Sequence, residues 1–175
     1  MGVTNTLRLE ERVAPDDDGF ASFVRESSTR LLRTAMLLCG DRSEADDLVQ
    51  TAYTTAFRRW RLVANADNPV AYVRRILTRT YLADRKRHPA HAELVETHDY
   101  ADSAVDQAGV ETRLSLLDAL ATLPALDRAV LVARYWEDLP VAETAALLGL
   151  TEGACRTRAS RALAGLRRHF PELED

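Results

Sequence analysis

Apolar residues recur every three or four positions along most of the chain, which is the spacing of an amphipathic α-helix. Strict alternation of apolar and polar residues, which would indicate half-buried strands, is almost absent. The first periodic stretch begins near Phe20 and ends at Gly40, a residue type that commonly terminates helices. Its apolar stripe consists of Phe20, Phe23, Val24, Leu31, Ala35 and Leu38. The pattern predicts an all-α protein.

A second amphipathic stretch follows directly in "DRSEADDLVQTAYTTAFRRW". Ser43, with Asp46 three residues later, is close to a capping box, so we expect this helix to begin there. We expect residues 61–67 to form a short connection. Asn68 is a good N-cap and Pro69 suits the first helical position, so a third helix should start at this pair. The stripe of the second helix is Ala45, Leu48, Val49, Ala52, Tyr53, Ala56, Phe57 and Trp60, and that of the third is Val73, Ile76, Leu77, Thr80 and Tyr81, with arginines outward.

A further helical unit starts near Val110 and is interrupted at Pro124. Its first apolar stripe is Leu114, Leu117 and Leu120. The segment "ALDRAVLVARYW" is apolar enough to be a central buried helix. A shorter helix is predicted from Leu139-Pro140 to Leu148, followed by a break at Gly149.

A short helix, a turn containing glycine and a longer basic helix are typical of a helix-turn-helix. Thr151 is a suitable N-cap for the basic helix. Its inward positions are Cys155, Ala159, Ala162, Leu163 and Leu166, and its outward positions are Arg156, Thr157, Ser160 and Arg161, with Arg167 and Arg168 beyond them. Arginine can pair with guanine in the major groove, and Thr and Ser are short enough to let the helix enter deeply. A plain helical hairpin with a solvated arginine face would give the same local pattern.

The charge distribution divides the 175-residue chain into parts. The net charge is −4, but residues 69–88 carry +5, residues 151–168 carry +4, and residues 89–109 carry −5 without a single Lys or Arg. Two basic helices separated by an acidic tether suggest two nucleic-acid-binding units. We therefore expect two small helical domains joined by a flexible acidic linker. The expected boundaries are a tail at 1–18, a first domain at 19–88, the linker at 89–109 and a second domain at 110–170.

Composition excludes several other classes. No apolar run is long enough for a membrane span, and the first residues lack the apolar core of a signal peptide, so a cytoplasmic protein is expected. Cys39 and Cys155 each lie in an apolar helical pattern and are predicted to be buried thiols. His88, His91 and His98 lack neighbouring cysteines and a usual ligand spacing, so no metal site and no cofactor are predicted.

Four stretches together resemble the group-4, or extracytoplasmic function (ECF), sigma factors of the sigma-70 family, in the branch common in actinobacteria. They are "LLCGDRSEADDLVQTAY", "NPVAYVRRIL", "LPALDRAVLVARYWEDLPVAETAALLGL" and "GACRTRASRALAGLRR", in the family's order and spacing. The resemblance implies a sigma region 2 helical bundle in the first domain and a sigma region 4 helix-turn-helix in the second. It also implies a linker that threads through channels of the polymerase.

The resemblance assigns roles to the polar positions. Asp47 and Gln50 match residues that dock on core RNA polymerase, although Thr51 stands where relatives often have Glu. The −10 element of promoter DNA would be contacted by Arg74, Arg75, Arg79, Arg85, Lys86 and Arg87, with Tyr72 and Tyr81 as aromatic candidates. The −35 element would be contacted by Arg156, Thr157, Ser160 and Arg161. Arg79 departs from the Asn that relatives use for base recognition, and Pro140 replaces their usual capping Ser or Thr.

These observations favour a sigma factor that binds core RNA polymerase and promoter DNA, performs no covalent chemistry, and has an anti-sigma factor as a candidate partner. A stand-alone helix-turn-helix repressor or activator would explain the second domain but leaves the "DDLVQ" helix and the first basic helix without a role. An enzyme is disfavoured because the sequence contains no phosphate-binding glycine loop and no recognisable catalytic constellation.

Overall fold

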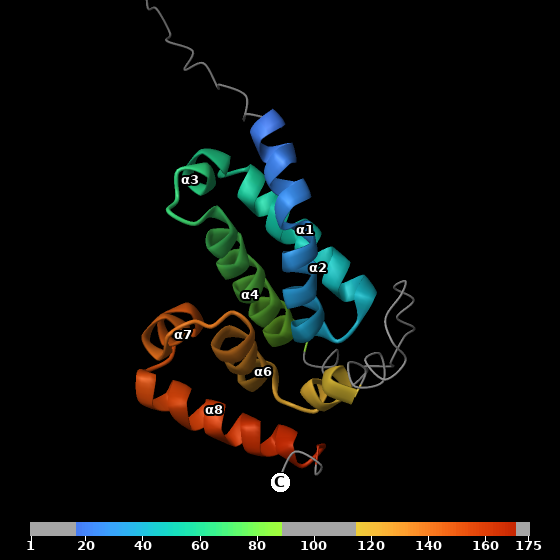
Figure 1. The fold of residues 1–175 in the computed structure, drawn as a ribbon, viewed down its shortest axis with the longest axis vertical. Helices are drawn as coiled ribbons and strands as arrows, with labels where there is room; N and C mark the ends of the chain where they lie inside the picture. The colour runs from blue at the N-terminus through green and yellow to red at the C-terminus, as the bar shows by residue number, and fades with distance from the viewer. Residues whose placement is uncertain (1–16, 89–114, 171–175) are drawn as a thin grey trace, which may run out of the picture.

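The computed structural model describes residues 17–88 and 115–170. The N-terminal half, residues 17–88, consists of α1 (Asp17–Cys39), α2 (Arg42–Phe57), α3 (Trp60–Ala64) and α4 (Pro69–Arg87). The long helices α1, α2 and α4 pack side by side, each antiparallel to the one before it, and α3 closes one end of the bundle (Figure 1). The predicted linker at 89–109 and most of the predicted tail lie outside the described residues.

The junction between α1 and α2 differs in detail from the expectation. Helix α1 ends at Cys39, and Gly40 directly after it terminates the helix, as predicted, in a left-handed conformation with φ +79°. The N-cap of α2 is Asp41, whose carboxylate accepts a hydrogen bond of 2.8 Å from the backbone N–H of Glu44. The prediction that Ser43 caps this helix is therefore wrong. An acidic residue three positions downstream follows both candidates, so the pattern alone did not discriminate between them.

Helix α3 replaces the short connection expected at residues 61–67. It begins at Trp60, and both Trp60 and Val63 are buried in the core. The Phe20 ring lies 5.2 Å from the Trp60 ring, centroid to centroid, and 5.0 Å from that of Phe57. This aromatic contact anchors the short helix, because five residues could not form a stable helix unaided.

The start of α4 confirms its prediction. The Asn68 side chain accepts a hydrogen bond of 2.9 Å from the backbone N–H of Ala71, and Pro69 occupies the first helical position. The buried residues of α4 are Val73, Leu77, Thr78 and Tyr81. Thr80, predicted to face inward, is half-buried.

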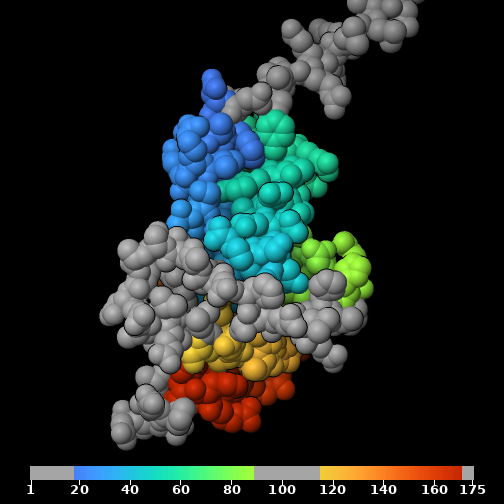
Figure 2. Space-filling view, turned by 90° about the vertical axis from the view of Figure 1, so that its right-hand side faces the viewer, coloured from blue at the N-terminus to red at the C-terminus, as the bar shows by residue number. Residues whose placement is uncertain are grey.

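The C-terminal half, residues 115–170, is the second helical unit. Residues 115–121 are helical and are followed by α6 (Ala125–Leu131), a π-helical turn η2 (Val132–Trp136), α7 (Val141–Leu148) and α8 (Glu152–Arg167). The predicted break at Pro124, the central buried helix and the short helix to Leu148 are all present. The expected start near Val110 and the stripe residue Leu114 lie outside the described residues. Figure 2 shows α8 at the end of the molecule opposite α3.

The two halves pack against each other. The largest apolar cluster contains Leu117, Ala129 and Val132 of the C-terminal half together with residues of α1, α2 and α4. Among the described residues, contacts run from α1 to α6 and η2, and from α4 to α6 and α7. The sequence indicated two helical units but gave no sign that they share a core.

Within the described ranges, no helix combines the length and the apolar character needed to cross a lipid bilayer.

Candidate nucleic-acid interface

The helix-turn-helix is formed by α7, α8 and the turn between them. Gly149 takes a left-handed conformation with φ +67°, which a residue without Cβ adopts at little cost. Thr151 then caps α8, its hydroxyl accepting from the backbone N–H of Ala154 at 3.2 Å. Both features confirm the sequence prediction. Pro140 lies at the N-cap of α7 and supplies no capping hydrogen bond.

One face of α8 is packed and the other is open. The packed face divides into two clusters: Cys155 and Ala159 lie with Val130 and Ala145, and Ala162 lies with Leu120 and Leu131. The four predicted DNA-contacting residues are all exposed: Arg156, Thr157, Ser160 and Arg161. Arg167 and Arg168 extend this exposed basic surface toward the end of the helix.

Ion pairs orient part of this face. Arg156 forms an exposed i, i+4 pair with Glu152 at 2.6 Å. Arg158, for which no role was predicted, binds Asp127 of α6 at 2.6 Å in a half-buried setting. This second pair links α8 to α6 and adds to the apolar packing of Cys155, Ala159 and Ala162, which sets the inward face of the helix.

The basic surface of α4 contains fewer available cations than expected. Arg75, Arg79, Lys86 and Arg87 are exposed, and Arg87 forms a surface pair with Asp84 at 3.1 Å. Arg74 and Arg85 are not directed outward, as the sequence prediction had them; only 12% and 11% of their side chains is exposed. Each is held by a carboxylate that lies outside α4. The spacing of apolar residues along α4 cannot identify such a partner.

Arg85 binds within the N-terminal half. It donates to Glu44 of α2 at 2.5 Å, and its guanidinium lies 5.4 Å from the centroid of the Tyr81 ring. Burial opposes the positive charge, but the carboxylate of Glu44 outweighs it and raises the pKa of Arg85. Tyr81 itself is 2% exposed, which confirms the expectation that it belongs to the core. Tyr72 is half-buried and packs against the same core.

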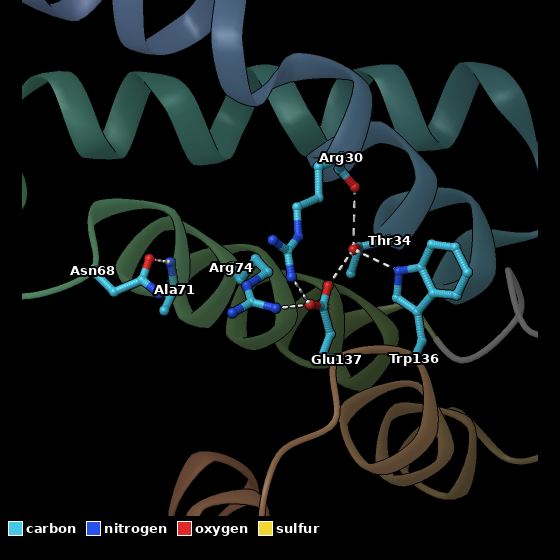
Figure 3. A network of polar contacts seen from close by, with 7 residues as sticks. All are labelled: Arg30, Thr34, Asn68, Ala71, Arg74, Trp136 and Glu137. Carbon is cyan, nitrogen blue, oxygen red and sulfur yellow. Dashed lines mark hydrogen bonds and ion pairs between the residues drawn. The ribbon is translucent and has the colours of Figure 1, made fainter.

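Arg74 belongs to a group of residues that joins the two halves and that we call the Glu137 network (Figure 3). The Glu137 carboxylate, 5% exposed, forms ion pairs with Arg74 of α4 and, at 3.5 Å, with Arg30 of α1. Thr34 donates to the same carboxylate at 2.5 Å and accepts from the indole N–H of Trp136 at 3.3 Å. Burial, together with the positive charges of Arg30 and Arg75, lowers the pKa of Arg74. Sequence analysis missed Glu137; the one available signal was an acid at the end of the most apolar segment.

A second arginine, which is buried, also connects the halves. Arg128 of α6 donates to the carbonyl of Leu38 at 2.7 Å and to that of Ala121 at 2.8 Å. The Leu38 carbonyl belongs to the last turn of α1, where no backbone N–H is available to it within the helix. Burial lowers the pKa of Arg128. Its role was not predicted, because a single cation inside an apolar run gives no indication of its partner.

The predicted polymerase-docking residues lie on a different surface. Asp47 and Gln50 are both exposed on α2, as is Thr51. Asp47 and Thr51 also line a hollow of about 290 Å³ between α2 and α4. Their neighbours on the inner face of α2, Leu48 and Val49, are buried, and Leu48 lines the inner wall of the hollow.

The described residues include two cysteines, one in each half of the chain. Cys39 and Cys155 are both buried free thiols, as predicted, and burial raises the pKa of Cys39 to about 12. Within residues 17–88 and 115–170, no three His, Cys, Asp or Glu side chains gather as metal ligands would. His91 and His98 lie outside the described residues.

Two basic helices, one of them in a helix-turn-helix, define the class of helical DNA-binding transcription proteins. The sequence matches the family model "Sigma-70 region 2" over residues 23–88 and "Sigma-70, region 4" over residues 113–166. The RNA polymerase sigma-E factor of Streptomyces avermitilis is 36% identical over 85% of this chain and 83% of that protein. The ECF RNA polymerase sigma factor SigM of Mycobacterium tuberculosis is 32% identical over 94% of this chain and 84% of that protein. The chain therefore belongs to the ECF branch of the sigma-70 family, whose members are transcription initiation factors.

Two solved structures share the fold. The sigma factor RpoE of Bartonella quintana, in complex with the anti-sigma factor NepR, is 19% identical with a TM-score of 0.69, covering 90% of this chain and 99% of that one. CnrH, in complex with the cytosolic domain of CnrY, is 20% identical with a TM-score of 0.60, covering 91% and 92%.

Proposed function

We propose that α8 enters the major groove at the −35 element with Arg156, Thr157, Ser160 and Arg161 facing the bases and phosphates. The observation that carries this assignment is the exposed basic face of α8, opposite a face packed on α6 and α7. Short Thr and Ser side chains between two arginines allow close approach, and an arginine can bind guanine with two hydrogen bonds. The apolar packing of α8, together with the Arg158–Asp127 pair to α6, keeps this face turned outward.

The −10 element is assigned to α4. Arg75, Arg79, Lys86 and Arg87 are available to phosphates as they stand, whereas Arg74 and Arg85 must first leave their carboxylate partners. Because Arg79 is exposed on the same helix, it is the candidate for a base preference different from that of relatives with Asn at this position. Exchanging Arg79 for Asn should change the preferred −10 sequence in a promoter selection rather than abolish activity.

Asp47 and Gln50 are assigned to core RNA polymerase. Both are polar and exposed on α2, away from the two basic surfaces. The chain thus supplies binding and positioning and leaves the covalent chemistry to the polymerase, in the cytoplasm where that enzyme works. An anti-sigma factor is a candidate partner by analogy with the RpoE and CnrH complexes.

Run-off transcription with reconstituted polymerase on a promoter library tests the α8 assignment. Arg156→Ala and Arg161→Ala should each reduce promoter-dependent transcription by about 5- to 150-fold, the range expected for loss of one arginine–guanine contact. Their binding to core polymerase should be unchanged. Arg25→Ala, which removes an exposed cation from α1, is the matched control. Equal loss of polymerase binding in the α8 variants would contradict the assignment.

Asp47→Ala should affect polymerase binding, which the α8 variants leave unchanged. It should weaken binding to core polymerase in a pull-down, while Glu26→Ala, which removes an exposed carboxylate from α1, should not. Unchanged polymerase affinity would remove Asp47 from the proposed interface. Tight binding of the free chain to a duplex operator, with no requirement for polymerase, would instead favour the stand-alone regulator.

A further inference from the structure

The packing of the C-terminal half on the N-terminal half removes Arg74 from the basic surface of α4. Of the charged groups in the Glu137 network, only Glu137 comes from the C-terminal half. Its carboxylate binds the Arg74 guanidinium, which a DNA phosphate would otherwise bind. A carboxylate and a phosphate bind arginine through the same fork of N–H donors. Arg74 therefore cannot serve Glu137 and a phosphate at the same time.

The closed arrangement is also too small for a promoter. If residues 17–88 and 115–170 form one compact body, its radius of gyration is about 14 Å and it measures about 40 Å across. The −10 and −35 elements lie about 25 base pairs apart, which is about 85 Å of duplex. A chain that contacts both elements must separate its two halves.

The contact between the halves has the character of a reversible interface. Apart from its apolar centre, it is fastened by buried polar groups: the Glu137 network and the hydrogen bond from Arg128 to Leu38. A small crevice of about 40 Å³ along the contact is lined by residues of both halves, including Thr34, Arg74 and Glu137. Removing one partner of a buried ion pair is strongly destabilising, because the other charge is left buried and unpaired, whereas both charges are readily solvated once the halves part. This combination suits a switch.

We propose that the free chain is autoinhibited: the Glu137 network holds region 4 on region 2 and withholds Arg74 from DNA until the halves part. The DNA-related part of this inference rests on the proposed role of α4; the closure itself does not. Because binding is reciprocal, whatever separates the halves exposes Arg74, and single-stranded DNA that takes Arg74 favours separation.

Small-angle X-ray scattering of the full chain tests the closure. Glu137→Gln keeps an amide for Thr34 but leaves the positive charges of Arg30 and Arg74 without their carboxylate. Its radius of gyration should rise by at least about 4 Å as the two bodies separate, with helix content by circular dichroism unchanged. Glu26→Gln makes the same charge change on an exposed site of α1 and should stay as compact as the parent chain. Equal compactness of both variants would overturn the proposal.

A charge exchange keeps the test valid if Glu137→Gln fails to fold. Arg74→Glu alone should open the chain, and Arg74→Glu combined with Glu137→Arg should restore compactness, because the pair is re-formed in the opposite sense. If the double variant is open, or if Arg74→Glu alone is closed, the Glu137 network does not hold the two halves together.

The DNA arm uses a fluorescein-labelled mixed-sequence single strand of about 20 nucleotides, with the free chain. Glu137→Gln should bind at least about threefold more tightly than Glu26→Gln, since both gain the same net charge but only one releases Arg74. Adding Arg74→Ala to Glu137→Gln should abolish that difference. Opening without tighter binding would overturn the inhibitory role and count against Arg74 in the −10 surface, while leaving closure in place. Tighter binding without opening would overturn the closure.

Discussion

Individual arginines in this protein have different roles that depend on their partners. Arg156 and Arg161 are exposed on α8, and Arg158 is paired with Asp127. Between the two halves, Arg74 is largely covered and Arg128 is buried. Helical periodicity identified the exposed arginines of α8, because exposure there is a property of one helix. It could not identify the buried ones, because their partners lie up to 90 positions away in the sequence.

Helix capping offers a direct test at the residue scale. Asp41→Ala should lower the free energy of unfolding by about 1 kcal/mol, because the backbone N–H of Glu44 loses its acceptor. Asp41→Asn should retain most of the stability. Ser43→Ala, at the cap expected from sequence, should change it by less than about 0.5 kcal/mol. Urea denaturation measures all three, and a larger loss at Ser43 than at Asp41 would contradict the observed cap.

The Cys39 thiol predicts an alkaline loss of stability. Its pKa is about 12 in the folded chain and 9.0 without burial, so above pH 9 the unfolded chain loses a proton that the native chain keeps. Stability should therefore fall between pH 9 and 12, by about 1.4 kcal/mol per pH unit from this group. Cys39→Ala should show a slope shallower by that amount when unfolding free energies at pH 8 and pH 10.5 are compared. Parallel slopes would show that the thiol is not buried as described.

At the scale of elements, the best predictions came from helix ends. Asn68-Pro69, Gly149 and Thr151 act through their own backbone conformation or a hydrogen bond three residues away, so the local sequence contains the whole cause. Helix α3 was missed because its five residues are helical only through packing of Trp60 and Val63 in the core. Local signals therefore predicted the helix-turn-helix and the exposed face of α8 correctly, but not the tertiary partners of α4.

Two of the three glycines of the helix-turn-helix, Gly149 and Gly153, should respond oppositely to alanine. Gly149→Ala places a Cβ at φ +67° and should destabilise the protein by about 1 kcal/mol. Gly153→Ala lies in the first turn of α8 with open space around its Cβ, and should be neutral or stabilise by up to about 1 kcal/mol. Thermal unfolding of both variants measures the difference, and a shift of the same sign in both would contradict the left-handed turn.

At the scale of the whole molecule, the shared core predicts cooperative unfolding. Trp60 lies in the N-terminal half and Trp136 in the C-terminal half, so one tryptophan can report on each. Trp60→Phe and Trp136→Phe should give fluorescence transitions whose midpoints coincide with those from circular dichroism on the same variant. A separate, earlier transition reported by Trp136 would show that the C-terminal half unfolds on its own.

The sequence established that there are two helical units and left their arrangement open. An amphipathic stripe indicates that one face of a helix is buried, but it does not identify the element that covers that face. The hydrophobic effect is non-directional, so an apolar stripe packs equally well against any other apolar stripe. The choice of partner here depends on Glu137 and Arg128, two charged residues whose burial is compensated only once both halves are in place. The packing of the two halves is therefore specified by pairs of residues that are far apart in the sequence.

The π-helical turn at Val132–Trp136 has a consequence for how this chain can evolve. Such a turn is an α-helix with one additional residue, and it ends immediately before Glu137. Loss of one codon there would leave an uninterrupted α-helix, because the wide turn already absorbs the additional residue without rotating the part of the chain that follows. Glu137 would keep its place opposite Arg30 and Arg74, and α7 and α8 would keep their internal geometry. Loss of one codon within a regular α-helical turn would instead rotate the residues after it by about 100°, so this turn is where the chain can become shorter and keep the Glu137 network.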